Sequence, residues 1–144
     1  MGIVYFDASA LVKLVVEEHG TDVASTIWDG CDAAVSSRLA YPEVRAALAA
    51  ARRNSDLTER ELRSAEATWE QFWAAMRPVE LSPRVERDAG QLAKKRALRG
   101  ADAVHLASAL AVDSPDLVFA VWDRRLHAGA IAEHIAVVPA TLNN

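Results

Sequence analysis

The sequence predicts an α/β fold in which a central parallel β-sheet carries helices on both faces. Short apolar runs rich in β-forming residues alternate along the chain with amphipathic helical segments, an order typical of parallel sheets. The 144 residues contain no low-complexity segment, long linker or internal repeat. We therefore expect a single domain over residues 1–144, a length that suits one hydrophobic core.

Five short apolar runs are the expected strands. The clearest is LVFAVW, and GIVYF near the N-terminus is also a continuous apolar run that indicates a buried strand. AAVSS is a weaker candidate, because it contains two serines. The expected strands are residues 2–6, 33–37, 78–81, 117–122 and 135–139.

Capping residues and glycines set the expected helix ends in the first half of the chain. Ser9 can cap a helix after the first strand, and Gly20 is expected to stop that helix. Gly30 closes a second, shorter helix. The expected helices here are 9–18, 21–29 and one from a cap at Ser36 or Ser37 to about Arg53.

The second half of the chain has stronger start signals. Thr58 with Glu61 matches a capping box, and Ser82 followed by Pro83 combines a cap with proline in the first turn. Gly100 is expected to stop the helix that Pro83 begins. The expected helices are a long amphipathic one after Thr58 that reaches Met76, one from Ser82 to about Leu98, one headed by Asp102 and a short one from about Arg124.

Composition and charge exclude several classes of protein. The net charge of −4 argues against a generic nucleic-acid coat protein. Cys31 is the only cysteine, so an internal disulfide is impossible, and the four histidines show no paired zinc-hydrolase spacing. No apolar run approaches the ~20 residues that span a bilayer, and no basic signal-peptide region opens the chain. We expect a cytoplasmic protein without membrane association.

Two acidic residues directly follow predicted strands. Asp7 comes after IVYF, and Asp123 comes after VFAVW. Ligands of open parallel sheets bind at the carboxyl ends of the strands, so two neighbouring strands would place both carboxylates on one rim. Each aspartate can equally be the cap of the helix that follows it. The residues alone leave both interpretations open.

Two further acids lie near the starts of predicted helices. Glu43 stands beside the apolar side of the helix in SRLAYPEVRAAL, where a rim residue that reaches water is also found. Asp102 lies in the first turn of a helix on which the face formed by Ala103, Leu106, Ala107 and Leu110 is expected to be buried. There it can also complement the helix dipole.

A cluster of these four acids has a physical consequence. Two carboxylates about 4 Å apart repel by on the order of 4 kcal/mol at an effective dielectric constant near 20. A cation or strongly raised pKa values must relieve such repulsion. Ligation by carboxylate oxygens alone is the preference of hard cations such as Mg²⁺ or Mn²⁺.

Four blocks of the sequence resemble the PIN-domain ribonucleases, specifically the VapC-type toxins of prokaryotic toxin–antitoxin modules. The blocks are VYFDASALVKLVVEE, SSRLAYPEVRAALAAAR, LRGADAVHLASAL and VFAVWDRRLHAGA, in the family's order and at its spacing. The resemblance covers almost the whole chain. It implies a PIN-like fold with an acidic pocket at one end of the sheet, and Mg²⁺- or Mn²⁺-dependent endonucleolytic cleavage of RNA.

The resemblance also implies roles for individual residues. The catalytic and metal-binding acids are expected to be Asp7, Glu43, Asp102 and Asp123, with Ser9 as the small hydroxyl residue near the first acid. Relatives often carry Ser or Thr shortly before the last acid, where this chain has Val121 and Trp122. Asp123 is therefore expected to complete the set either as a direct ligand, through a bound water or at a second metal.

Basic residues around the pocket are expected to bind the phosphates of RNA, although a solvated helix face accounts equally well for about half of them. The candidates are Lys94, Lys95, Arg96, Arg99, Arg124 and Arg125. The resemblance further implies a homodimer and a VapB-type antitoxin that blocks the acidic pocket, with the helices 9–18 and 39–53 as its groove.

Two other functions are compatible with the residues. A Mg²⁺-dependent phosphatase could use Asp7 as its nucleophile, although that chemistry expects a second aspartate where Ser9 stands. A catalytically silent binding protein could keep the fold for partner recognition alone. Formation of a covalent phosphoaspartate distinguishes the first alternative, and undetectable metal binding distinguishes the second.

Overall fold

Five parallel strands form one sheet in the computed structural model, which describes residues 2–143. Their spatial order is β3-β2-β1-β4-β5, with the N-terminal strand at the centre. Each neighbouring pair is parallel, as the alternation of strands and helices predicts. The strands are β1 (Ile3–Phe6), β2 (Ala33–Ser37), β3 (Arg77–Val79), β4 (Val118–Ala120) and β5 (Ala136–Val138).

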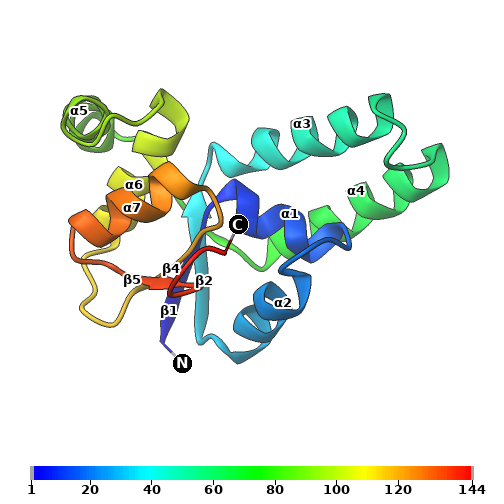
Figure 1. Cartoon of the computed structure of the whole chain (residues 1–144), viewed down its shortest axis with the longest axis horizontal. Coiled ribbons are helices and arrows are strands. Elements are labelled where there is room, and N and C mark those ends of the chain that lie inside the picture. The colour runs from blue at the N-terminus through cyan, green and yellow to red at the C-terminus, as the bar shows by residue number, and fades with distance from the viewer. Residues whose placement is uncertain (1, 144) are drawn as a thin grey trace.

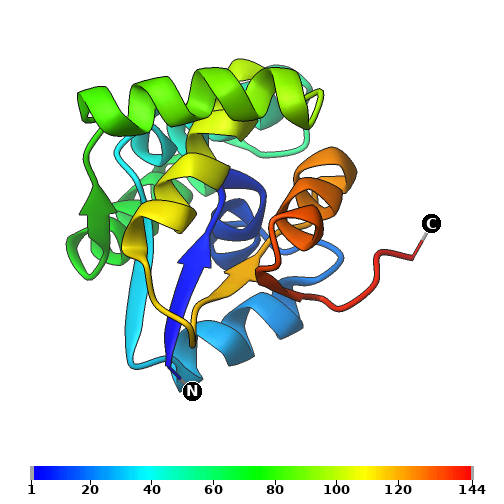
Figure 2. The ribbon, with the colours of Figure 1, turned by 90° about the vertical axis from the view of Figure 1, so that its left-hand side faces the viewer.

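Helices cover both faces of this sheet, which confirms the predicted architecture. Figure 2 shows the face that carries the last three helices, and Figure 1 shows the first four on the opposite side. One layer consists of α1 (Ala8–Val15), α2 (Thr21–Gly30), α3 (Ala40–Arg53) and α4 (Glu59–Ala74). The other consists of α5 (Pro83–Lys95), α6 (Gly100–Val112) and α7 (Arg124–Ala132).

The alternation of side chains along β1 explains why the sheet is covered on both faces. Val4 and Phe6 pack into the core beneath α1–α4, whereas Tyr5 between them packs into the core beneath α5–α7. All three side chains are fully buried. Because successive strand residues point to opposite faces, a continuous apolar run requires a cover on both.

The order of the strands creates a switch point between β1 and β4. The chain runs from β1 outward through β2 to β3, then crosses back over the sheet through α5 and α6 to reach β4. The crossovers from β1 and from β4 therefore depart in opposite directions, which leaves the carboxyl ends of these two strands as the place where a ligand is expected.

Three expected helix ends differ from the observed ones. Asp7, not Ser9, caps α1, because the Asp7 carboxylate accepts the Ala10 N–H. Gly20 does not stop α1, which ends earlier; with φ at +92° it caps the start of α2. The reversal after α5 occurs at Ala97, whose φ is +54°, and Gly100 instead begins α6.

Three other expectations are also corrected. Ser36 and Ser37 both belong to β2; Ser37 accepts the Leu39 N–H in the turn before α3 but is not its cap. Met76 lies beyond the end of α4 and is buried just before β3. Leu110 is 37% exposed near the end of α6, where it lines a cavity and is not part of the core.

No helix among residues 2–143 is long and apolar enough to cross a membrane.

Candidate active site

The ends of β1 and β4 lie side by side, because the two strands pair in register with Phe6 opposite Ala120. The Asp7 N–H donates to the Ala120 carbonyl at 3.3 Å, which extends the pairing to the first acid. Asp123 follows three residues after Ala120 and caps α7. The condition under which both aspartates share one rim, that these strands are neighbours, is confirmed.

Asp7 is a buried carboxylate at the centre of this rim, with only 4% of its surface exposed. Its Oδ1 accepts the Ala10 N–H at 3.0 Å, so it caps α1 while facing the other acids. Burial, with a smaller contribution from the nearby Asp123, raises the pKa of Asp7 to about 6 against the opposing effects of His105, Ser9 and Ala10. Desolvation and repulsion therefore outweigh the hydrogen bonds that favour the ionised form.

Ser9 connects the ends of the two strands. Its hydroxyl donates to the Asp7 carboxylate, with Oγ 2.7 Å from Oδ1 and 2.9 Å from Oδ2. The same oxygen accepts the Trp122 N–H at 3.1 Å, one residue before Asp123. The fourth sequence block lacks a hydroxyl before its aspartate, and Ser9 places one beside that stretch from the end of β1.

Glu43 reaches the rim from the first turn of α3, where Pro42 precedes it without interrupting the helix. Its Oε1 lies 2.6 Å from Nε2 of His105, which belongs to α6 in the opposite helical layer. The other ring nitrogen of His105 lies 2.7 Å from the Tyr5 hydroxyl. Glu43 is thus tied across the edge of the sheet to β1 and α6.

Asp102 lies in the first turn of α6, one helical turn before His105. Burial raises its pKa above the ordinary value, and the charges of Asp123 and Glu43 also raise it, whereas Arg99 and His105 lower it. Its Oδ2 is buried and has no hydrogen-bond partner among the described residues 2–143. This oxygen is an acceptor without a compensating donor, and such atoms are rare in folded proteins.

Arg99 lies between Asp102 and Asp123. Its Nε is 3.6 Å from Asp102 Oδ2, and its Nη2 is 3.7 Å from Asp123 Oδ2. These are long contacts from a side chain that is 73% exposed, so the guanidinium neutralises the two carboxylates only partly.

The structure brings the four predicted acids to one edge of the sheet, but it does not arrange them as the complete coordination shell of a metal ion. Asp7 and Asp102 each interact electrostatically with Asp123, and Asp102 also interacts with Glu43. Over the described range 2–143, no three His, Cys, Asp or Glu side chains are arranged as the ligands of one metal ion. His105 engages Glu43, and Arg99 occupies the space between the two other aspartates.

Comparison with known proteins identifies the family. The PIN domain family model matches residues 4–131. Ribonuclease VapC45 of Mycobacterium tuberculosis (strain CDC 1551 / Oshkosh) is 69% identical over 143 residues, which cover 99% of each chain. The chain belongs to the PIN-domain family.

Solved structures agree on the fold of this PIN domain. A toxin–antitoxin complex from Klebsiella pneumoniae superposes with a TM-score of 0.66 at 17% identity, covering 97% of this chain and 99% of that one. Mycobacterium tuberculosis VapC20, described as a Sarcin-Ricin loop cleaving toxin, also gives a TM-score of 0.66, at 16% identity and over 87% and 93% of the two chains. At these identities the likeness concerns the fold.

The basic residues predicted for RNA binding differ in their exposure and in the contacts that their side chains make within the PIN domain. Lys95 and Arg96 both pair with Glu133 at the end of α7, and Arg96 also donates to the Ala132 carbonyl. They therefore join α5 to α7. Lys94, Arg124 and Arg125 are exposed, and Arg99 faces the acids.

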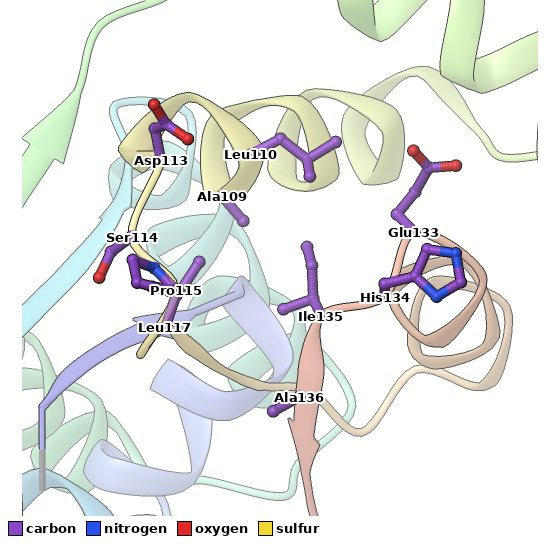
Figure 3. Close-up of a pocket in the computed structure, with 10 residues that line it drawn as sticks. All are labelled: Ala109, Leu110, Asp113, Ser114, Pro115, Leu117, Glu133, His134, Ile135 and Ala136. Carbon is purple, nitrogen blue, oxygen red and sulfur yellow. The ribbon is translucent and has the colours of Figure 1, made fainter.

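A separate cavity of about 300 Å³ lies at the other edge of the PIN domain's sheet (Figure 3). It is formed where α6 ends, before β4, and where α7 ends, before β5. Leu110 and Ile135 form part of its wall, and the labelled polar side chains of Asp113 and Glu133 stand at its margin. Because it opens at the amino ends of the strands, it is distinct from the acidic edge.

Sequence reasoning identified the acids but missed His105 and Tyr5. His105 is fully buried, and so is Tyr5, although both side chains are polar. The available signal was a histidine three residues after Asp102 on an otherwise apolar helix, since residues at that spacing share a face.

Proposed function

We propose that this PIN domain is the toxin of a type II toxin–antitoxin module and an endoribonuclease that cleaves RNA with the help of Mg²⁺ or Mn²⁺. The observation that carries the proposal is the set of under-compensated carboxylates at the switch point. Asp7 and Asp102 both have raised pKa values, and within the part of the chain that the structure describes Asp102 Oδ2 has no hydrogen-bond donor. The 69% identity to a protein named Ribonuclease VapC45 supports this function.

The residues present suit a hard divalent cation. All four candidate ligands offer carboxylate oxygens, and the buried Oδ2 of Asp102 has the unfilled acceptor capacity that a cation satisfies. Asp7, Glu43, Asp102 and Asp123 would hold the ion, which when bound supplies positive charge to the scissile phosphate and acidifies the attacking water. Ion binding requires Arg99 to leave the space between Asp102 and Asp123.

The chain's own residues prepare this site before RNA arrives. Ser9 and the Ala10 N–H hold the Asp7 carboxylate by hydrogen bonds, and Glu43 shares a hydrogen bond with His105. One of the four carboxylates accepts the proton of the attacking water. Preorganised groups of this kind need no rearrangement at the moment of reaction, which is the main source of electrostatic catalysis.

The basic side chains that flank the acidic edge are the proposed phosphate-binding residues. Arg124 and Arg125 begin α7 directly after Asp123, and Lys94 and Arg99 lie at the end of α5 and the start of α6. Arg96 contributes less, because its guanidinium already pairs with Glu133. Positive charges at these positions offset the repulsion between RNA and the carboxylates.

The proposed partners are a VapB-type antitoxin and a second copy of the chain. The toxin–antitoxin complex from Klebsiella pneumoniae supports the first of these. The apolar positions of α1 and α3 are largely used in the core, with Leu11, Val44 and Leu48 buried. An antitoxin segment would therefore contact their partly exposed side chains and cover the acids. Cytoplasmic location is part of the same proposal.

The test is cleavage of RNA by antitoxin-free protein. Total prokaryotic RNA is incubated with Mg²⁺, with Mn²⁺ or with EDTA, using the unaltered protein, Asp102→Asn and the control Asp116→Asn. Asp116 is exposed in the loop before β4, at the amino end of that strand, whereas the acids lie at the carboxyl ends of the strands. We expect discrete, metal-dependent products from the unaltered protein and the control only. Intact RNA in every lane, together with no Mn²⁺ binding by calorimetry, contradicts the proposal and favours a silent binding protein.

A further inference from the structure

A hydrogen-bonded chain of three side chains crosses the edge of the sheet from the core to the acidic site. The Tyr5 hydroxyl lies 2.7 Å from His105 Nδ1, and His105 Nε2 lies 2.6 Å from Glu43 Oε1. The three residues come from β1, α6 and α3, so the chain connects the central strand with both helical layers. Only Glu43, at its outer end, reaches solvent to any extent.

The chemistry of the groups fixes the direction of the hydrogen bond between His105 and Glu43. An ionised carboxylate only accepts, so His105 Nε2 carries the proton that is shared with Glu43. In the neutral imidazole Nδ1 is then an acceptor for the Tyr5 hydroxyl, and in the imidazolium Nδ1 donates to Tyr5. In both forms the bond to Tyr5 occupies Nδ1 and leaves Nε2 as the donor that faces Glu43.

Burial makes this arrangement rigid. His105 is 1% exposed and Tyr5 is fully buried, and their rings meet edge to face with centroids 5.8 Å apart. Tyr5 also packs against Phe119 of β4, with ring centroids 5.0 Å apart. The imidazole therefore has no room to change its orientation, and neither of its nitrogens is left without a partner.

We propose that His105 is a positioning residue which, held by Tyr5, orients the Glu43 carboxylate for the divalent ion. The hydrogen bond engages Oε1, and the second oxygen of the carboxylate remains for the cation. Asp102 lies one turn earlier on the same helix. Helix α6 therefore carries one candidate ligand, Asp102, and also the residue that orients a second one, Glu43. The inference rests on the proposed function, since it assumes that Glu43 is a ligand.

The test measures Mn²⁺ affinity by calorimetry on folded, RNA-free protein, with urea unfolding as a separate readout. The variants are His105→Ala, His105→Gln, Tyr5→Phe, Glu43→Gln and the double variant of Glu43→Gln with His105→Ala. Glutamine can place an amide N–H near the position of Nε2. His127→Ala is the matched control, because His127 is also buried and its Nε2 lies 2.8 Å from the Pro139 carbonyl oxygen, outside the acidic edge.

We expect His105→Ala to weaken Mn²⁺ binding about 10- to 100-fold, the usual effect of losing a residue that orients a ligand. His105→Gln restores most of the affinity, and Tyr5→Phe loses a few-fold. In the Glu43→Gln background the His105→Ala change has no further effect on affinity, because a residue that acts through Glu43 has nothing left to orient. His127→Ala lowers stability but not affinity.

Additive losses in the double variant, or equal losses from His105→Ala and His127→Ala, overturn the inference and leave His105 with a structural role. If His105→Ala does not fold, the Mn²⁺ affinities of Tyr5→Phe and His105→Gln test the positioning role of His105 in its place. Unaltered Mn²⁺ affinity in Tyr5→Phe and His105→Ala, with metal-dependent RNA cleavage intact, refutes the positioning role alone. Absence of both Mn²⁺ binding and cleavage in the unaltered protein refutes the proposed function as well.

Discussion

The ends of β1 and β4 have the same local design and different electrostatics. At each, an aspartate follows the strand and caps the next helix: Asp7 accepts the Ala10 N–H at 3.0 Å, and Asp123 accepts the Leu126 N–H at 2.9 Å. Asp7 is 4% exposed, whereas the Asp123 side chain is 30% exposed. The first is compensated by the Ser9 hydroxyl, the second by the distant charge of Arg99.

The difference shows that capping and function are not alternatives at these positions. The cap explains why each carboxylate lies at the start of a helix. It does not explain why the Asp7 carboxylate is buried, which costs desolvation free energy. Asp7 is locked in place by neutral donors, and Asp123 can change its partner when Arg99 moves. We infer that Asp7 is the fixed ligand of the site and Asp123 the adjustable one.

The largest expected effect comes from exchanging each aspartate for asparagine, which keeps the cap because asparagine caps helices as well as aspartate does. Asp7→Asn should reduce metal-dependent RNA cleavage on the order of 10³-fold, as loss of a preorganised charge-stabilising group does. Asp123→Asn should cost about 10-fold, as loss of an outer partner does. Rates are measured on one defined RNA at saturating Mg²⁺.

Circular dichroism and urea unfolding serve as controls that both variants fold. Equal rate losses in the two variants would show that the two strand ends contribute alike, and a larger loss in Asp123→Asn would reverse our assignment.

The second effect is a pH dependence of stability that belongs to Asp7. Burial raises its folded-state pKa to about 6, whereas the unfolded chain titrates near the ordinary value of about 3.9. Between these values the folded protein holds a proton that the unfolded chain has lost. The stabilisation is therefore complete below about pH 4 and is lost as the pH rises through about 6, a fall of about 3 kcal/mol in the free energy of unfolding.

Urea unfolding of metal-free protein in EDTA from pH 4 to 7 measures this fall. Asp7→Asn should show a much shallower decline, and Asp123→Asn should retain most of the decline, because burial raises the pKa of Asp7 more than Asp123 does. A residual slope in Asp7→Asn is expected from Asp102, whose pKa is also raised. Parallel curves for the unaltered protein and Asp7→Asn rule out a buried, proton-binding Asp7.

The sequence predicted the features that depend on local chemistry. The apolar runs ending in Asp7 and Asp123 identified two strands of the sheet, which the structure places side by side, and the Thr58–Glu61 capping box is present as expected. Strand ends and helix starts made the four acids candidates, and their assignment to one site came from the resemblance to the PIN-domain ribonucleases.

The contacts among the site's side chains could not be predicted in the same way. The bond from His105 to Glu43 joins residues 62 positions apart, and the bond to Tyr5 spans 100 positions. Such pairs depend on how α3 and α6 meet over the sheet, which no local pattern encodes. For the same reason KKRALR gave no sign that Arg96 would pair with Glu133 while Arg99 would turn to the acids.

The smallest effect concerns Arg99, which contacts Asp102 and Asp123 but not Asp7. Arg99→Gln should tighten Mn²⁺ binding about two- to fivefold, the scale of a weak exposed ion pair, because the cation no longer competes with a guanidinium. The same change should weaken RNA binding and reduce its salt dependence by about one phosphate contact. Calorimetry and filter binding over a salt series measure the two opposite effects.

Arg84→Gln is the matched control, since Arg84 is an exposed arginine whose contact is with Asp88 on its own helix. If Arg99→Gln leaves Mn²⁺ affinity unchanged, Arg99 does not compete for the carboxylates. If it weakens Mn²⁺ binding, the guanidinium supports the site instead of blocking it. Opposite shifts in the two affinities mean that Arg99 passes from the carboxylates of Asp102 and Asp123 to RNA as the ion enters, which couples metal binding to substrate binding.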